Sequence, residues 1–257
     1  MPETTLSIAL IAENEADRIG KLLQSAEFAD EIVVVDSGST DGTPKLCEKK
    51  GAKVLFKQWS GYAGQKQFAL ESTSSEWILN LDADEEISAN LAAEIRKAIE
   101  NADADVCAFS MPRLSRYLGR WIKHGGWYPD RKVRLVRKGK GMWTGAALHE
   151  HLVVEGKTER LFHPLLHHVY RSISDQLKTI DRFSDIHAAG RGPSNSWFVA
   201  AGIFHALGKF AECYLWKLGF LDGIAGLIIA MNSSWYVFLK HAKAWELNHS
   251  EKNRTGN

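Results

Sequence analysis

Residues 77–86 read WILNLDADEE, and this stretch decides how the rest of the chain is interpreted. Four of its first six residues are large and apolar, which predicts a buried β-strand. Four acids follow within five positions, namely Asp82, Asp84, Glu85 and Glu86. Because neighbouring carboxylates repel one another, we expect a cation or another polar partner where this strand ends.

Strands and helices alternate around this stretch through the first hundred residues. Further strands are predicted at 5–12, 31–36 and 52–58, and helices at 14–29, 43–51, 62–74 and 88–101. This alternation predicts an α/β fold, with a mostly parallel central sheet and helices on both faces. Ligands of such sheets bind at the carboxyl ends of the strands. Polar clusters end three of the four strands, at 13–15, 36–41 and 82–86, so one crevice could collect all three.

The pattern changes from about Asp105, and the chain reads as helical from Ile173 onward. We therefore expect two domains, 1–170 and 171–257, the second being a helical region. Its longest apolar run, 223–231, is too short to cross a bilayer, so no spanning helix is predicted. Eleven aromatic residues within the 49 positions 197–245, with lysines among them, suit either core packing or contact with a membrane surface.

The net charge is +1, but one segment of the chain is strongly basic. Between Arg113 and Lys140 the chain has ten Lys and Arg residues and one acid, Asp130. Such a segment is either a solvated face or a surface that attracts phosphates or an anionic membrane. Nucleic acid is not expected as a partner, because no recognition helix or aromatic stacking platform accompanies the charge. The three cysteines are widely spaced, which is typical of a reducing cytosolic compartment.

The pair Asp82 and Asp84 suits a divalent cation. Mg²⁺ and Mn²⁺ take carboxylate oxygens and keep positions open for phosphate oxygens. A calcium loop is excluded, since Ile87 and Ala93 stand where that loop needs glycine and glutamate. The alternative is that both acids are solvated at the end of the strand, where their negative charge favours the start of the next helix. Asp36 has two interpretations as well, an acceptor for a nucleobase N–H or a cap of the turn that follows it.

Three stretches carry a resemblance to a known family. They are IALIAENEADRIGKLLQSA (8–26), EIVVVDSGSTDGT (31–43) and WILNLDADEEIS (77–88). In this order and spacing they resemble the nucleotide-sugar-binding half of glycosyltransferase family 2, whose members are inverting enzymes with a GT-A fold. The resemblance implies that Glu13 lies near the nucleoside, that Asp36 contacts the base and that Asp41 forms a polar wall of the base pocket. It also implies that Asp82 lies near the ribose or diphosphate and that Asp84 binds Mn²⁺ or Mg²⁺.

The stretch GGWYPDRKVRLVRKGKGMWTGAALHEH (125–151) narrows the resemblance. Its W-x-P-D, R-L-x-R and H-E features are similar to those of bacterial lipopolysaccharide inner-core glucosyltransferases. This implies transfer of a hexose, glucose in that subgroup, from a UDP-sugar to a lipopolysaccharide-core or other lipid-linked acceptor. It also implies an enzyme on the cytoplasmic face of the inner membrane, in peripheral contact with it.

Inversion in one displacement needs a carboxylate base that is separate from the metal ligands. We predict Glu150, which lies between two histidines and matches the H-E of the family, and Asp130 as the second candidate. Asp130 stands beside Arg131 and Lys132, which would lower its pKa and weaken it as a base. One of the adjacent histidines 167 and 168 could complete the metal shell as in some GT-A enzymes, and His168 is our prediction.

Rival functions remain open at this point. A processive polysaccharide synthase needs Q-x-x-R-W, but Tyr117 stands where the glutamine belongs before Arg120 and Trp121. A zinc hydrolase is not supported, since HEHLV at 149–153 departs from H-E-x-x-H. Three alternatives stay open: a nucleotidyltransferase, a nucleotide-binding scaffold without turnover, and a glycosyltransferase with a polysaccharide or protein acceptor.

Overall fold

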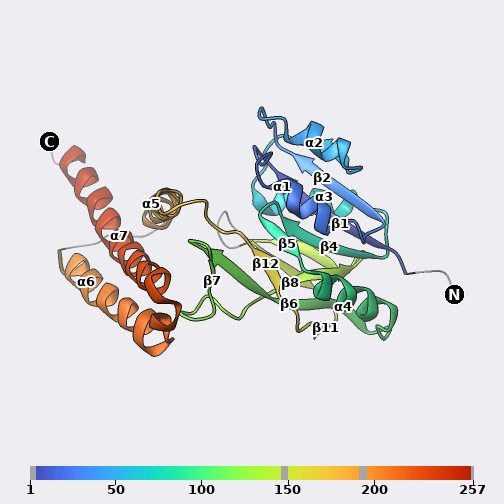
Figure 1. Cartoon of the computed structure of the whole chain (residues 1–257). Coiled ribbons are helices and arrows are strands. Elements are labelled where there is room, and N and C mark those ends of the chain that lie inside the picture. The colour runs from blue at the N-terminus through green and yellow to red at the C-terminus, as the bar shows by residue number, and fades with distance from the viewer. Residues whose placement is uncertain (1–3, 146–149, 191–195, 256–257) are drawn as a thin grey trace. The chain divides into compact units, whose positions relative to one another are not determined.

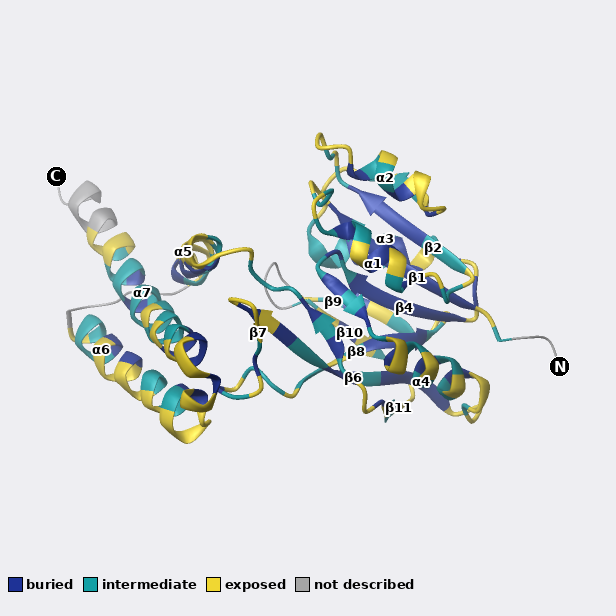
Figure 2. Ribbon diagram, viewed as in Figure 1, coloured by how far each residue is buried: buried dark blue, intermediate teal, exposed yellow. Residues whose placement is uncertain are grey.

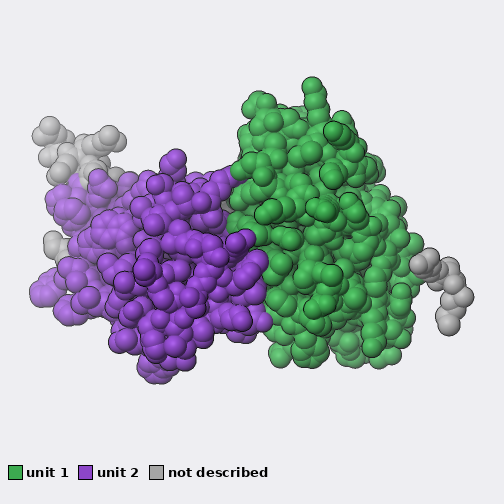
Figure 3. Space-filling view, in the orientation of Figure 1, with its two compact units in different colours: residues 1–113, 130–168 green, residues 114–129, 169–257 purple. Residues whose placement is uncertain are grey.

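The computed structural model describes residues 4–145, 150–190 and 196–255. The chain forms two compact units (Figures 1 and 3). Unit 1 comprises Met1–Arg113 and Asp130–His168, and unit 2 comprises Leu114–Pro129 and Val169–Asn257. The insertion 114–129, which the predicted boundary assigns to the first domain, is therefore grouped with the C-terminal helices.

The first half of the sheet in unit 1 is parallel. Its strands are β1 (Leu6–Ala12), β2 (Glu31–Asp36), β3 (Lys53–Phe56) and β4 (Trp77–Asp82), in the order β3-β2-β1-β4. The register pairs Ala12 with Asp36 and Ile11 with Asp82. The polar ends of the three strands therefore meet at one edge of the sheet, as the sequence predicts.

The second half of the sheet contains antiparallel pairs. Here β8 (Asp130–Arg137) pairs antiparallel with both β4 and β6 (Val106–Tyr117). The sheet then continues through β12 (Leu165–His167) to β5 (Glu85–Ile87). Shorter strands complete the described elements: β7 (Arg120–Trp121), β9 (Gly141–Thr144), β10 (His151–Val154) and β11 (Lys157–Arg160).

Helices cover both faces of the sheet, as predicted for an α/β fold. They are α1 (Ile19–Ser25), α2 (Thr43–Lys49), α3 (Tyr62–Glu71) and α4 (Ala89–Glu100). Alternate residues of a strand point to opposite faces. Ile8 and Leu10 pack in the cluster that includes α1 and α4, whereas Ala9 packs in the cluster that includes α3. Figure 2 shows the resulting buried strands between half-exposed helices.

Ser88, the first residue of the helix predicted at 88–101, caps α4. Its Oγ accepts a hydrogen bond from the backbone N–H of Leu91 at 3.2 Å. Ser88→Ala is expected to destabilise the protein by about 1 kcal/mol, because a donor of the first turn loses its acceptor. Thermal unfolding should show a decrease of about 2–4 °C in Tm. Ser88→Thr keeps the acceptor oxygen and serves as the control. Equal Tm values for wild type and Ser88→Ala would contradict the assignment.

The C-terminal part of unit 2 is helical, as predicted, but it is broken in the middle. Its elements are α5 (Ile173–Ala189), α6 (Ser196–Ala211), the π-helical turn η1 (Glu212–Trp216), the 3₁₀ turn η2 (Gly219–Asp222) and α7 (Gly223–Thr255). The break is tightly packed, since a Cβ on Gly226 would lie 1.9 Å from the carbonyl oxygen of Gly219. Both α5 and α6 pack on α7.

Two segments of unit 2 are long and apolar enough to cross a membrane. They are Trp197–Trp216 and Gly219–His249, of which only 17 and 28% is buried. The prediction of no spanning helix considered the run 223–231 alone, whereas the two helices qualify as candidates by length and composition. These two criteria are also met by core helices of soluble proteins, but such helices are mostly buried.

Candidate active site

Two loops at the carboxyl ends of β1 and β2 are joined by hydrogen bonds. The backbone N–H of Asn14 donates to Ser39 Oγ at 2.8 Å, and that of Thr40 donates to Asn14 Oδ1 at 2.9 Å. Asp41 accepts from the backbone N–H groups of Ala16 and Thr43, each at 3.0 Å. The two loops therefore form one wall at the edge of the sheet.

The three donor-site acids predicted in these loops have different surroundings. Asp36 is buried and accepts from the backbone N–H groups of Gly38 and Ser39, so it does cap its turn. The hydrogen bond from the Thr43 hydroxyl is the main cause that lowers the pKa of Asp41. Glu13 is exposed directly after β1. All three lie in or beside the wall.

Asp82 is held between two cations. Lys66 Nζ lies 2.8 Å from its Oδ1, and the Arg134 guanidinium contacts its Oδ2. Burial would raise the pKa of Asp82, but the attraction of Arg134 and Lys66 outweighs burial and holds this pKa well below its usual value. Asp82 is therefore ionised and already neutralised by the protein.

The other two acids that follow Asp84 also have close partners. Glu85 is buried, and its Oε1 lies 2.7 Å from the Arg134 guanidinium. Glu86 Oε2 lies 2.9 Å from Nε2 of His168. The crowding of acids in DADEE is thus balanced largely by side chains from distant parts of unit 1.

Asp84 is paired more loosely than these neighbours. Its Oδ2 lies 3.5 Å from Nε2 of His167 and 3.6 Å from the Arg18 guanidinium. Burial opposes ionisation, but the interaction with His167 and the charge of Arg18 outweigh burial, so the pKa of Asp84 lies below its ordinary value. An ionised carboxylate without a close cation is suited to bind a metal ion.

A carboxylate oxygen and an imidazole nitrogen meet at Asp84 and His167. Mn²⁺ accepts both kinds of donor, and Mg²⁺ is often bound by one or two carboxylates plus substrate phosphates. Within the described residues there is no group of three or more His, Cys, Asp or Glu side chains that could hold a metal. The carboxylate of Asp84 and the imidazole of His167 would fit a divalent cation as two of its ligands.

Glu150 lies beside the same lysine as Asp82. Lys66 Nζ is 3.2 Å from Glu150 Oε1, and it lies 4.8 Å from the centre of the Trp143 ring. Lys66 therefore connects two acids that are 68 positions apart in the sequence, Asp82 and Glu150. The neighbouring His149 of the H-E feature lies outside the described residues.

Asp130, the second candidate base, has two cationic partners. Its carboxylate lies 2.6 Å from the Arg113 guanidinium and 3.1 Å from Lys132 Nζ. Burial would raise the pKa of Asp130, but Arg113 and Lys132 outweigh burial and lower it. These contacts make Asp130 a weaker base.

Part of the basic segment is paired with acids of unit 1. Arg134 pairs with Glu85, and Arg113 pairs with Asp130. Arg137 contacts Glu76 at 2.6 Å. Exposed cations of the segment occur in both units, at Arg116, Arg120 and Lys123 in unit 2 and at Lys132, Lys138 and Lys140 in unit 1. Whether they form a solvated face or a surface that attracts phosphates stays a prediction.

Sequence reasoning missed Lys66 and Arg18. Lys66 stands in the predicted helix 62–74 among other polar residues, and no local motif marks it. Its burial, with only 8% of the residue exposed, becomes visible only when α3 is packed on the sheet.

The family model described as Glycosyl transferase family 2 matches residues 7–151, more than half of the chain. This chain belongs to glycosyltransferase family 2. The match includes the wall, the DADEE cluster and Glu150. The glycosyltransferase is also 31% identical, over 99% of its length and 96% of the relative, to the Lipopolysaccharide core biosynthesis glycosyltransferase LpsC of Rhizobium meliloti (strain 1021).

Solved structures give weaker likenesses. S. aureus TarS 1–349 aligns with 99% of this glycosyltransferase and 92% of that chain, at 13% identity and a TM-score of 0.47. Glucosyl-3-phosphoglycerate synthase from Mycobacterium tuberculosis, in complex with Mn²⁺, UDP-glucose and phosphoglyceric acid, aligns over 44% of each chain at 22% identity and a TM-score of 0.37. At these TM-scores neither likeness says anything about ligands. The site above rests on the side-chain geometry of the glycosyltransferase itself.

Proposed function

We propose that this glycosyltransferase transfers a hexose, with inversion, from a UDP-sugar to a lipopolysaccharide-core or other lipid-linked acceptor. The observation that carries the proposal is the meeting of Asp82 and Glu150 at Lys66. Asp82 ends a strand of the donor half, and Glu150 lies after the last residues of the basic segment. One buried cation thus brings a donor-side acid and a candidate base into the same small region.

The nucleoside of the donor binds along the wall made by the loops after β1 and β2. Glu13 faces the nucleoside, Asp36 the base, and Asp41 holds the shape of the pocket. The hydrogen bonds between the two loops support this assignment, since they fix the wall before the donor arrives. Asp82 is assigned to the ribose or the first phosphate.

Asp84 would hold a divalent cation beside the donor diphosphate. The cation would supply positive charge that stabilises the leaving diphosphate. His167 is the better supported second ligand, since its Nε2 faces Asp84 while that of His168 contacts Glu86. The assignment of His168 from the sequence stays a prediction, to be decided by the variants in the Discussion.

Glu150 acts as the general base. It takes the proton of the acceptor hydroxyl while that oxygen forms a bond to the anomeric carbon and the bond to the diphosphate breaks. Its place beside Lys66 supports the role, because the lysine holds the carboxylate at the site. Asp130 is the alternative, less suited because Arg113 and Lys132 already neutralise it.

A lipid-linked acceptor is supported by the relative named for lipopolysaccharide core biosynthesis, which spans nearly the whole chain. The exposed apolar helices of unit 2 are consistent with work at a membrane surface. We place the enzyme on the cytoplasmic face of the inner membrane, where nucleotide sugars are available, in peripheral contact with the lipid.

A screen of nucleotide sugars by thermal shift, with Mn²⁺ and with EDTA, tests the proposal. A UDP-hexose should raise Tm in Mn²⁺ and much less in EDTA. Each nucleotide sugar that binds is then incubated with the enzyme to detect release of free nucleoside diphosphate. Binding without any turnover, with or without lipopolysaccharide core, would favour a nucleotide-binding scaffold instead.

A further inference from the structure

Unit 2 exposes a long apolar face on α6 and the turn that follows it. Trp197, Phe204 and Trp216 are 82, 74 and 87% exposed, and Ile203, Leu207 and Leu215 lie exposed between them. Figure 2 shows several exposed positions along α6. Soluble monomers rarely expose contiguous apolar patches of this kind, and such patches mark binding surfaces for proteins or membranes.

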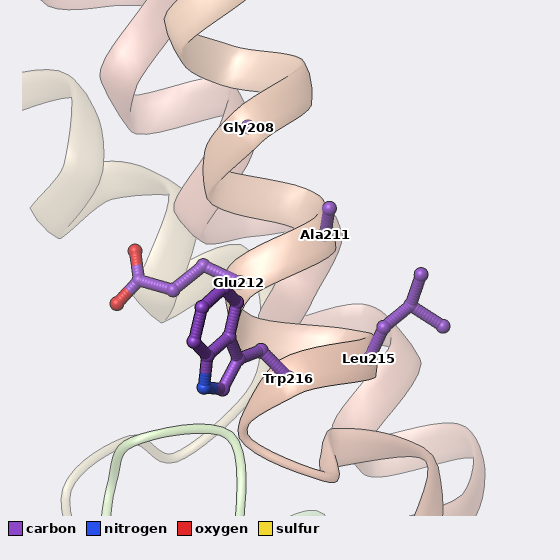
Figure 4. A pocket seen from close by; sticks show the side chains of 5 residues that line it. All are labelled: Gly208, Ala211, Glu212, Leu215 and Trp216. Carbon is purple, nitrogen blue, oxygen red and sulfur yellow. The ribbon is translucent and has the colours of Figure 1, made fainter.

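A shallow, open pocket of about 580 Å³ lies near the end of the stripe (Figure 4). Its lining consists of Gly208, Ala211, Glu212, Leu215 and Trp216. The charge of Glu212 is balanced, since its carboxylate lies 3.0 Å from Lys209 Nζ and 2.5 Å from Lys217 Nζ. The rest of the lining is apolar, and the small residues 208 and 211 leave room beside the helix backbone.

A group of cations is fixed next to this turn. Asp222 is buried in η2 and accepts from the backbone N–H groups of Lys123 at 3.1 Å and His124 at 2.8 Å. The N–H of Gly125 donates to the Lys217 carbonyl at 2.8 Å. These bonds tie the insertion 114–129 to the turn. The insertion contains no acid and exposes Arg116, Arg120 and Lys123.

Ion pairs between α7 and α5 are evidence against a helix that crosses the bilayer. Lys243 of α7 lies 2.6 Å from Asp181 and 2.7 Å from Asp185 of α5. Both aspartates are more than half exposed, so this side of α7 runs beside a charged surface. Since charges at the bilayer centre are costly, α7 cannot be surrounded by lipid along its length. In an interfacial position the apolar stripe of α6 can face lipid while the charges of α5 stay in water.

We propose that the outer face of α6 and η1 lies in the interface of an anionic lipid leaflet, in the plane of the membrane. Arg116, Arg120 and Lys123 then contact lipid phosphates beside the inserted turn. A second copy of the chain fits this surface less well, because pairing the same patch on both copies would bring the two cation groups together. The inference deepens the proposed function, since a lipid-linked acceptor places the enzyme at such a surface.

The test uses the full chain and vesicles of phosphatidylcholine, with and without 30% phosphatidylglycerol. Wild type should co-sediment with the anionic vesicles, and binding should weaken from low salt to physiological salt, where the Debye length is about 8 Å. Phe204→Glu should weaken binding by about 10-fold or more, because a buried apolar ring is replaced by a carboxylate that stays in water. Lys123→Glu should weaken binding to anionic vesicles only.

Phe162→Glu is the matched control, since Phe162 is 75% exposed but lies in unit 1. It should bind vesicles like wild type. The proposal is overturned if wild type ignores anionic vesicles at low salt, if both phenylalanine variants behave alike, or if sedimentation shows that Phe204→Glu converts a dimer to a monomer. The thermal shift caused by a UDP-hexose should be unchanged in Phe204→Glu, so a failed membrane contact and a failed donor assignment give different results.

Discussion

Asp84→Ala is expected to reduce sugar transfer by at least about 10³-fold, a loss of about 4 kcal/mol in transition-state stabilisation. Asp84 is the acid of the DADEE cluster whose ion-pair partners are most distant, at 3.5 and 3.6 Å. If Asp84 holds the cation as proposed, its removal would leave the charge of the leaving diphosphate without that stabilisation. Steady-state kinetics and calorimetric titration of UDP with Mn²⁺ measure the two effects.

The fold should survive this change, because Asp84 bridges no buried ion pair as tight as that between Arg134 and Glu85. Glu76→Gln is the matched control. It changes an acid just before the same strand, where Glu76 contacts Arg137, and it should leave Mn²⁺-dependent UDP binding intact. If folded Asp84→Ala transfers sugar at a near wild-type rate, transfer does not depend on a metal ion bound by Asp84.

The two histidines can be separated in the same assay. His167→Ala is expected to weaken Mn²⁺ affinity by about 10–100-fold, the usual effect of losing a group that binds or orients at a metal. His168→Ala should have a smaller effect, since His168 contacts Glu86. The opposite ranking would assign the metal to His168, as predicted from the sequence.

Glu150→Gln is expected to lower the transfer rate by about 10²–10⁴-fold, the usual contribution of general acid–base catalysis. The amide keeps the shape of the side chain and can still accept from Lys66, but it cannot take a proton. Affinities for UDP and Mn²⁺ should therefore stay close to those of wild type. Rapid-quench measurement of the transfer step separates this effect from binding.

Asp130→Asn is the comparison for this variant. Asp130 lies between Arg113 and Lys132, so its removal should lower transfer less than Glu150→Gln does. If Glu150→Gln transfers at near wild-type rate while Asp130→Asn is inactive, the base is Asp130. Inactivity of both variants with unchanged donor binding would require the acceptor affinity to be measured for each.

The parallel half of the fold could be predicted because its signals are local. The runs 31–36 and 77–82 are mostly apolar and end in an aspartate, and Ser88 is a favourable N-cap. Parallel order then brings the ends of β1, β2 and β4 to one edge without further information. The positions of Asp36, Asp41 and Asp82 follow from that order.

The antiparallel half and the partners of the acids depend on contacts far apart in the sequence. Arg134 reads as one cation among ten, and only the pairing of β8 with β4 places it beside Asp82 and Glu85. Lys66 is similarly ordinary within its helix. The break at 212–222 was missed because its aromatic and leucine residues continue the helical pattern on both sides, while the tight approach of Gly226 to Gly219 is a tertiary contact.

The most direct test of the central claim is turnover of a UDP-hexose by wild-type protein, with lipopolysaccharide core as acceptor. Release of UDP and appearance of the glycosylated core are followed together in Mn²⁺, after EDTA, and after Mn²⁺ is restored. We predict equal amounts of the two products in Mn²⁺, loss of both in EDTA and recovery of both on restoration. Undiminished transfer in EDTA, or no transfer from any nucleotide sugar that binds, would contradict a metal-dependent glycosyltransferase built on Asp84.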